Sequence, residues 1–106
     1  MKLPTPIPVS RAIAKLGRDL SLARRRRRLS QASLAERMGV SLATVKRLEH
    51  GDPGVAIEIV ARALHVLGEI DRIDKLLETS DDALGLTLMD EQLPQRVRAR
   101  KTSGAM

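Results

Sequence analysis

Residues 29–51 decide the fold, and they read LSQASLAERMGVSLATVKRLEHG. Ser30 and Ser41 each precede a short helical pattern, where a serine side chain accepts a hydrogen bond from a free N–H group of the first turn. Gly39 and Gly51 follow these patterns, because the residue just past a helix often needs a positive φ. The spacing predicts two short helices joined by a three-residue turn, over residues 31–38 and 42–49.

The second of these helices has one face that suits DNA. Val45 and Leu48 form its apolar stripe, and the residues off this stripe are expected to face outward. They are Leu42, Ala43, Lys46 and Arg47. An α-helix fits the major groove, where an arginine can donate two hydrogen bonds to guanine and small apolar side chains suit a thymine methyl group. The alternative is an ordinary helical hairpin whose basic face is solvated.

This segment resembles the helix-turn-helix family of phage repressors and xenobiotic-response-element-type regulators. The resemblance extends from about Gly17 to Leu77 and rests on Leu29-Ser30-Gln31, Leu34-Ala35, Gly39-Val40-Ser41, Thr44-Val45 and Leu48-Glu49-x-Gly51. It implies base-reading positions at Ser41, Leu42, Ala43 and Arg47. It implies DNA phosphate contacts at Gln31, Thr44 and Lys46. With the helical patterns described below, it indicates an all-α fold: a compact, five-helix, repressor-like domain over residues 10–78.

The composition limits the range of functions. A chain of 106 residues supports one domain with a modest core, and its net charge of +6 favours a polyanionic partner. The absence of aromatic residues argues against base stacking on single strands, and the absence of cysteine excludes disulfides and zinc-thiolate sites. We find no phosphate-binding loop, metal-ligand spacing, catalytic constellation or membrane-length apolar run. These features predict a cytoplasmic, non-enzymatic protein that binds double-stranded DNA without a cofactor or metal.

The N-terminal residues 1–9 carry proline at positions 4, 6 and 8. Proline favours extended backbone, so we expect an extended arm, either a loose leader or an edge strand that pairs along one side. Ser10 is then predicted to cap a helix over residues 11–28. The apolar stripe of this helix consists of Ile13, Leu16, Leu20 and Ala23.

A run of five arginines closes this helix. The apolar stripe, continued by one turn, points Arg24 inward, where a buried guanidinium needs a carboxylate. Glu49 is the candidate partner, and the resembling repressors often pair residues at these two positions. Arg25, Arg26 and Arg28 are expected to face outward, with Arg28 beside the DNA backbone. The alternative is five exposed, interchangeable arginines.

Two further helices are predicted in the second half of the chain. The first, over residues 55–67, is apolar nearly all round, which predicts a helix buried on most sides. The second covers residues 69–77. The resemblance implies the two-fold contact of a homodimer on its apolar face, at Ile70, Ile73 and Leu77. The alternative is that this helix only closes the core.

Residues 79–106 form a basic C-terminal extension. Within it, residues 80–92 combine a helix start with the alternating leucines of a strand, and either structure fits. The stretch Asp82–Arg98 resembles the C-terminal extension of HipB-like antitoxins, regulators encoded beside HipA-type kinase toxins. It implies a HipA-like toxin kinase as partner.

The function predicted is a dimeric repressor that binds an inverted-repeat operator and, as an antitoxin, represses its own operon. The alternatives are a stand-alone regulator without a toxin, and a nucleoid-like protein that binds DNA without sequence preference.

Overall fold

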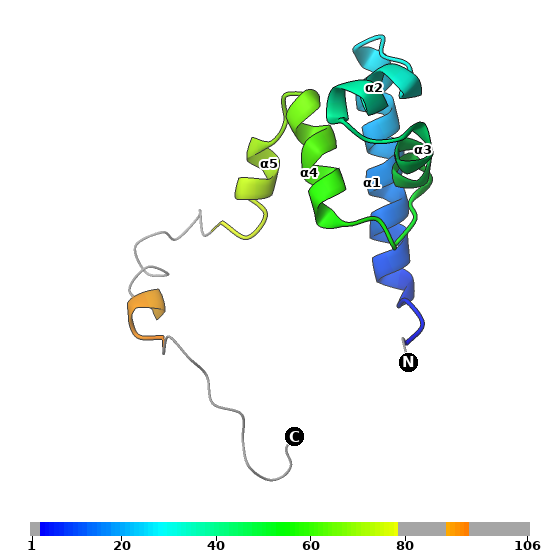
Figure 1. Cartoon of the computed structure of the whole chain (residues 1–106). Helices are drawn as coiled ribbons and strands as arrows, with labels where there is room; N and C mark the ends of the chain where they lie inside the picture. Colours follow the sequence, from blue (N-terminus) through cyan, green and yellow to red (C-terminus); the bar gives the residue numbers. More distant parts are fainter. Residues whose placement is uncertain (1–2, 79–88, 94–106) are drawn as a thin grey trace. The chain divides into compact units, whose positions relative to one another are not determined.

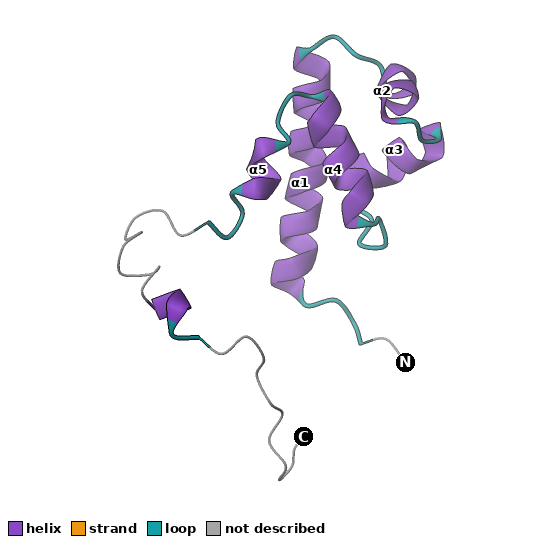
Figure 2. Cartoon of the chain, turned by 60° about the vertical axis from the view of Figure 1, so that its left-hand side comes forward, coloured by secondary structure: helices purple, strands orange, loops and turns teal. Residues whose placement is uncertain are grey.

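The structure is a computed structural model that describes residues 3–78 and 89–93. Within these residues the regular secondary structure is entirely helical, which confirms the predicted all-α class (Figures 1 and 2). The helices are α1 (Ile7–Arg26), α2 (Gln31–Met38), α3 (Leu42–His50), α4 (Ile57–Val66) and α5 (Asp71–Asp74).

The chain separates into two units, Met1–Leu76 and Leu77–Met106, and the first contains all five labelled helices. In the second unit a helical turn covers residues 89–91. Residues 80–88, where the sequence fits either a helix or a strand, lie outside the described residues.

The ends of α2 and α3 follow the sequence signals. Each capping serine accepts a hydrogen bond from a backbone N–H group of the first turn, at 3.0 Å for Ser30 and 3.2 Å for Ser41. Gly39 and Gly51 follow the two helices with φ of 74° and 81°, values that glycine adopts without steric cost. Helix α3 ends one residue later than predicted, at His50.

Helix α1 begins earlier than predicted, at Ile7 rather than at residue 11. Pro6 stands at its N-cap with φ −59° and ψ 146°, and Pro8 lies in the first turn. Proline loses no helical hydrogen bond there, because N–H groups of the first turn have no partner within the helix, and its fixed φ suits a helix. The extended arm is therefore limited to residues 3–6 of the described chain, and Ser10 lies inside α1 instead of capping it.

The core is small and contains no aromatic residue. Its largest fully buried side chains are Leu34 on α2 and Val45 on α3. The other buried hydrophobic residues are Leu20, Ala35, Met38, Leu48, Ala63 and Leu67. Helix α3 packs against both α1 and α2, and α2 packs against α4. In both views the first turns of α1 extend past α2, α3, α4 and α5 (Figures 1 and 2).

At Gly17 the backbones of α1 and α3 come into direct contact. A Cβ atom at Gly17 would lie 2.6 Å from the carbonyl oxygen of Glu49 and 2.8 Å from that of Leu48, so glycine alone permits this approach. The predicted apolar stripe of α1 is therefore wrong at Leu16, which is exposed, while its neighbour Gly17 is buried.

Helix α4 is shorter and more exposed than predicted. Within Ile57–Val66 only Ala63 is fully buried, and Ile57 is 69% exposed, so the prediction of a helix buried on most sides is wrong. Of the described helices, only α2 packs closely on α4 over several residues. A five-helix domain of this size has too few elements to cover every apolar face.

Helix α5 is a single turn of four residues, where residues 69–77 were predicted. Ile70 and Ile73 are half-buried, whereas Leu76 and Leu77 are 69% and 95% exposed. A single turn ends too early to carry one continuous apolar face from Ile70 to Leu77.

Candidate nucleic-acid interface

One side of α3 faces solvent and the other faces the core. Val45 and Leu48 are buried. The exposed side, here called the outer face of α3, consists of Ser41, Leu42, Ala43, Lys46 and Arg47. The structure therefore brings the four predicted base-reading residues and Lys46 together on one surface.

Two hydroxyl groups fix the start of this outer face. Ser41 Oγ accepts a hydrogen bond from the Thr44 backbone N–H at 3.2 Å and lies 2.9 Å from Thr44 Oγ1. Thr44 is half-buried. Both hydroxyls thus have a partner within the first turn. The sequence pattern identified Ser41 as a cap but missed the hydroxyl pair, although a serine and a threonine three residues apart at a helix start favour it.

A buried ion pair joins α1 to the inner side of α3. Arg24 donates from Nε to Glu49 Oε2 at 2.6 Å and from Nη2 to Glu49 Oε1 at 3.0 Å. The two side chains are 11% and 6% exposed. This is the pair that the sequence predicted. A buried charge needs a partner, so neither side chain can move away from the other without a large cost. The pair therefore restricts the angle between α1 and α3.

The same carboxylate also holds the first residue of α2. Gln31 donates from Nε2 to Glu49 Oε1 at 3.0 Å. The second hydrogen of this amide is not needed for the contact, so Gln31 retains a donor for another acceptor. Sequence reasoning placed Gln31 at the DNA backbone but missed its contact with Glu49, which depends on how α2 and α3 pack.

The five arginines of the run are not equivalent. Arg25 donates to the Ser21 carbonyl at 3.4 Å on the surface of α1. Arg27 donates to the Ala23 carbonyl at 2.8 Å, and its Nη2 lies 3.5 Å from Glu69 Oε2. The contact between Arg27 and Glu69, which ties the end of α1 to the start of α5, had no sequence signal.

Helix α4 holds the end of α2 through one arginine. Arg62 donates from Nη1 to the carbonyl oxygen of Met38, the last residue of α2, at 3.0 Å. Its Nη2 also pairs with Glu58 at 3.0 Å. The turn between α2 and α3 is therefore fixed from the side of α4 as well as by Gly39.

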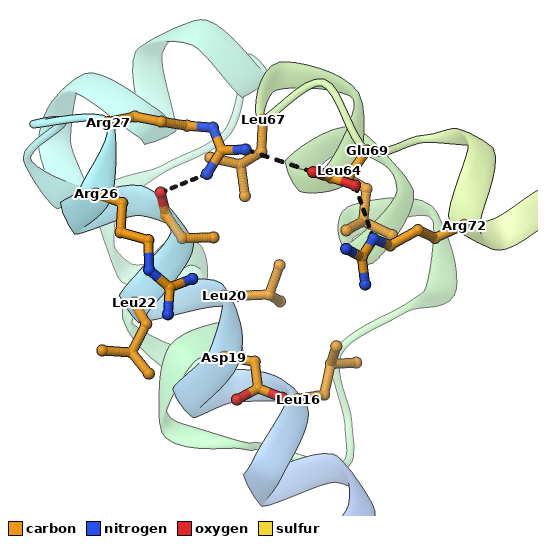
Figure 3. Close-up of a pocket in the computed structure, with 11 residues that line it drawn as sticks. Leu16, Asp19, Leu20, Leu22, Arg26, Arg27, Leu64, Leu67, Glu69 and Arg72 are labelled. Carbon is orange, nitrogen blue, oxygen red and sulfur yellow. Dashed lines mark hydrogen bonds and ion pairs between the residues drawn. The ribbon is translucent and has the colours of Figure 1, made fainter.

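A groove of about 410 Å³ lies between α1, α4 and α5, and no residue of α3 is among those that line it (Figure 3). Leu16, Leu20 and Leu64 contribute to its apolar lining. Along its edge, Glu69 lies between Arg27 and Arg72, and the Arg72 Nε is 2.7 Å from Glu69 Oε1. The groove thus has an apolar lining and an edge that carries both positive and negative side chains.

Two carboxylates in this region have perturbed acidity. The hydrogen bond from Arg72 is the main cause that lowers the pKa of Glu69, and the nearby charges of Arg72 and Arg27 act in the same direction. The hydrogen bond from Lys15 lowers the pKa of Asp19. Both groups are thus held in the charged form, which suits an ion pair and not a general base near neutral pH.

The described part of the chain contains no group of three or more side chains that could hold a metal ion. Among the helices that the structure describes, none is long and apolar enough to cross a membrane.

Comparison with known proteins agrees with this geometry. No curated protein gives a significant match to the chain. The sequence model of a family described as a helix-turn-helix domain matches residues 15–86, which is more than half of the chain and includes α2 and α3. This chain therefore belongs to the helix-turn-helix domain family, and its domain is that of a DNA-binding regulator.

Proposed function

We propose that the protein is a sequence-specific transcriptional repressor that binds double-stranded DNA as a homodimer. The observation that carries the proposal is the outer face of α3, which is exposed while the other side of the helix is anchored through the buried pair of Arg24 and Glu49. A rigidly held helix with a basic exposed side matches the geometry needed in the major groove.

The residues of this interface have different proposed roles. Arg47 donates to guanine, and Leu42 and Ala43 contact thymine methyl groups, while Ser41 approaches the bases mainly as the helix cap. The backbone phosphates are contacted by Gln31, Thr44 and Lys46. Support comes from the exposure of the charged residues among them and from the second hydrogen of the Gln31 amide.

The homodimer is proposed to form through the region of α5. Ile70 and Ile73 keep part of their apolar surface in solvent. Leu76 and Leu77, which follow α5 in the sequence, are both exposed. Burial of such side chains in a second copy removes apolar area from water. A two-fold dimer presents two α3 helices to an inverted repeat with half-sites one helical turn, or a multiple, apart.

Selection from a randomised duplex library tests this function. The selected sequences should contain an inverted repeat with that spacing. Lys46→Ala should weaken binding to selected and random duplexes by the same factor, because a phosphate contact carries no sequence information. A protein that enriches no sequence over competitor DNA would contradict the proposal and favour binding without sequence preference.

We further propose that this repressor is an antitoxin that binds a HipA-like toxin kinase. The support is the resemblance of Asp82–Arg98 to HipB-like extensions, together with two exposed apolar side chains in the described part of that stretch. Met89 and Leu93 are each 62% exposed. The alternative is a stand-alone regulator, which needs no partner for these side chains.

Co-purification with the product of the adjacent downstream gene distinguishes the antitoxin from the stand-alone regulator. The wild-type chain should retain a kinase-like product, and a Met89→Asp, Leu93→Asp double variant should lose it while still binding DNA. If the double variant still retains the kinase-like product, the contact with that product does not depend on Met89 and Leu93. An adjacent product that is unrelated to a kinase and is not retained would favour the stand-alone regulator.

A further inference from the structure

Four helix ends in this protein share one backbone turn. At the ends of α1, α2, α3 and α4, an N–H group donates to the carbonyl oxygen five residues earlier, at 3.2, 3.0, 3.0 and 2.7 Å. This turn satisfies carbonyl groups that the helix leaves without partners. At each end the residue just before the donor has a positive φ. These residues are Arg28 (57°), Gly39 (74°), Gly51 (81°) and Gly68 (79°).

Arg28 differs from the other three. It is the one non-glycine residue with a positive φ in the described chain. A side chain in this conformation lies too close to the neighbouring carbonyl oxygen, so a glycine would make the same turn with less strain. Strained residues of this kind persist where the surrounding structure holds them, and they cluster at functional sites.

The surroundings of Arg28 do hold the turn. Arg24 donates from Nη1 to the carbonyl oxygen of Leu29 at 2.7 Å, and the same guanidinium is paired with buried Glu49. Leu29 is half-buried and packs against the core. The backbone next to Arg28 is therefore fixed by contacts that do not involve the Arg28 side chain.

The Arg28 side chain makes no specific contact within the described residues that would offset the strain. It is exposed, and it forms no hydrogen bond or ion pair with any residue that the structure describes. By contrast, Arg24, Arg25 and Arg27 all donate hydrogen bonds to the domain. Arg28 stands two residues before the cap of α2, directly before the segment that contains Gln31.

We propose that Arg28 is a DNA-backbone-binding residue whose charge is retained although its backbone conformation lowers folding stability. The inference rests on the proposed DNA-binding function. It assigns to Arg28 a contact with a phosphate group that adds affinity without sequence preference.

The test measures stability and DNA binding of the same full-length variants. Arg28→Gly should raise the melting temperature by about 4 °C or more, because strain is relieved. It should weaken binding to selected and random duplexes by the same factor. The slope of log affinity against log salt should shrink by about 1.8, because each of the two protomers loses one phosphate contact that contributes about 0.9. Arg28→Lys keeps the charge and the strain, so both properties should stay near those of the wild type.

Gly68→Arg is the matched control for the backbone. A Cβ atom at Gly68 would meet no atom within 4 Å, so this variant reports the effect of an arginine at a left-handed helix end without a new clash. Its melting temperature should fall by about as much as Arg28→Gly raises it.

The salt slope, the melting temperature and the DNA binding of the wild type each test a different part of the proposal. An unchanged salt slope for Arg28→Gly would overturn the phosphate contact, and a lowered melting temperature would make Arg28 a structural residue. Wild-type protein that binds neither duplex would instead contradict the proposed function.

Discussion

The two sides of helix α1 are built differently. On the closed side, which faces α3, Gly17 touches the α3 backbone, and Arg24 is paired with Glu49 below the surface. On the open side, which faces α4 and α5, Leu16 and Leu22 are 37% and 40% exposed and border the groove of about 410 Å³. Close packing is thus concentrated where α3 is held, and apolar surface is left on the opposite side.

The two sides should respond differently to substitution. On the closed side, backbone contacts and a buried charge pair have little room to relax, so small changes are costly. On the open side, exposed side chains can move and water reaches the ion pairs, so the same changes cost less. The comparison therefore makes predictions that differ between neighbouring residues of one helix.

The largest expected effect is loss of the buried pair. Arg24→Ala and Glu49→Ala should each lower the free energy of unfolding by about 3–5 kcal/mol, because the remaining charge stays buried without its partner. The double variant should be less destabilised than the sum of the two. Arg25→Ala is the control on the same helix, and it should change stability by no more than about 0.5 kcal/mol. Denaturant titrations that give Arg24→Ala the stability of Arg25→Ala would remove the distinction between the two sides.

A smaller effect is expected from adding one methyl group at the helix crossing. Gly17→Ala should destabilise by about 1–3 kcal/mol, since the new Cβ atom would lie 2.6 Å from a carbonyl oxygen of α3. Leu16→Ala, the adjacent residue on the open side, should cost about 1 kcal/mol or less. Thermal and denaturant unfolding of both variants provide the measurement. If Leu16→Ala destabilised the protein more than Gly17→Ala, the open side, and not the closed side, would limit stability.

The region of α5, which the open side of α1 faces, is expected to govern assembly more than folding. Ile73→Asp would place an unpaired charge in the proposed dimer contact, so sedimentation analysis should show a folded monomer with weakened operator binding. Val9→Asp alters an exposed apolar residue in the first turns of α1 and should leave the dimer intact. A folded dimer of Ile73→Asp would place the two-fold contact elsewhere.

The smallest expected effect is the acid response of Glu69, which lines the groove on the open side of α1. Because the pKa of Glu69 is lowered in the folded protein, its charge stabilises the fold above the ordinary carboxyl pKa, and this contribution is lost as the pH falls through the lowered value. Glu69→Gln should therefore reduce the difference in melting temperature between pH 6 and pH 3, while Glu36→Gln on α2 serves as the control. A larger pH response in Glu69→Gln than in the wild type would reverse this sign.

The part of the fold that could be predicted rests on signals between near neighbours. Ser30 and Ser41 fixed two helix starts, and Gly39 and Gly51 fixed two helix ends, because caps and positive-φ turns depend on a few adjacent residues. Helical periodicity was enough to turn Arg24 inward and to turn the outer face of α3 toward solvent.

The part that could not be predicted depends on contacts between segments distant in sequence. From the sequence alone, Gly17 is only a residue of low helix propensity. Its role in the contact with the α3 backbone becomes visible only in the packed structure. The contacts of Gln31 with Glu49 and of Arg27 with Glu69 likewise require the packed helices. The prolines near the N-terminus led to the wrong start for α1, because proline fits both an extended chain and a first helical turn.

The central claim is that the outer face of α3 reads base sequence, and Arg47→Ala tests it most directly. Fluorescence anisotropy at one fixed salt concentration would compare the wild type and this variant on a selected duplex and on a random duplex. The wild type should prefer the selected duplex. Arg47→Ala should lose about 1–3 kcal/mol of binding free energy per half-site there and little on the random duplex. Equal losses on the two duplexes would contradict the claim.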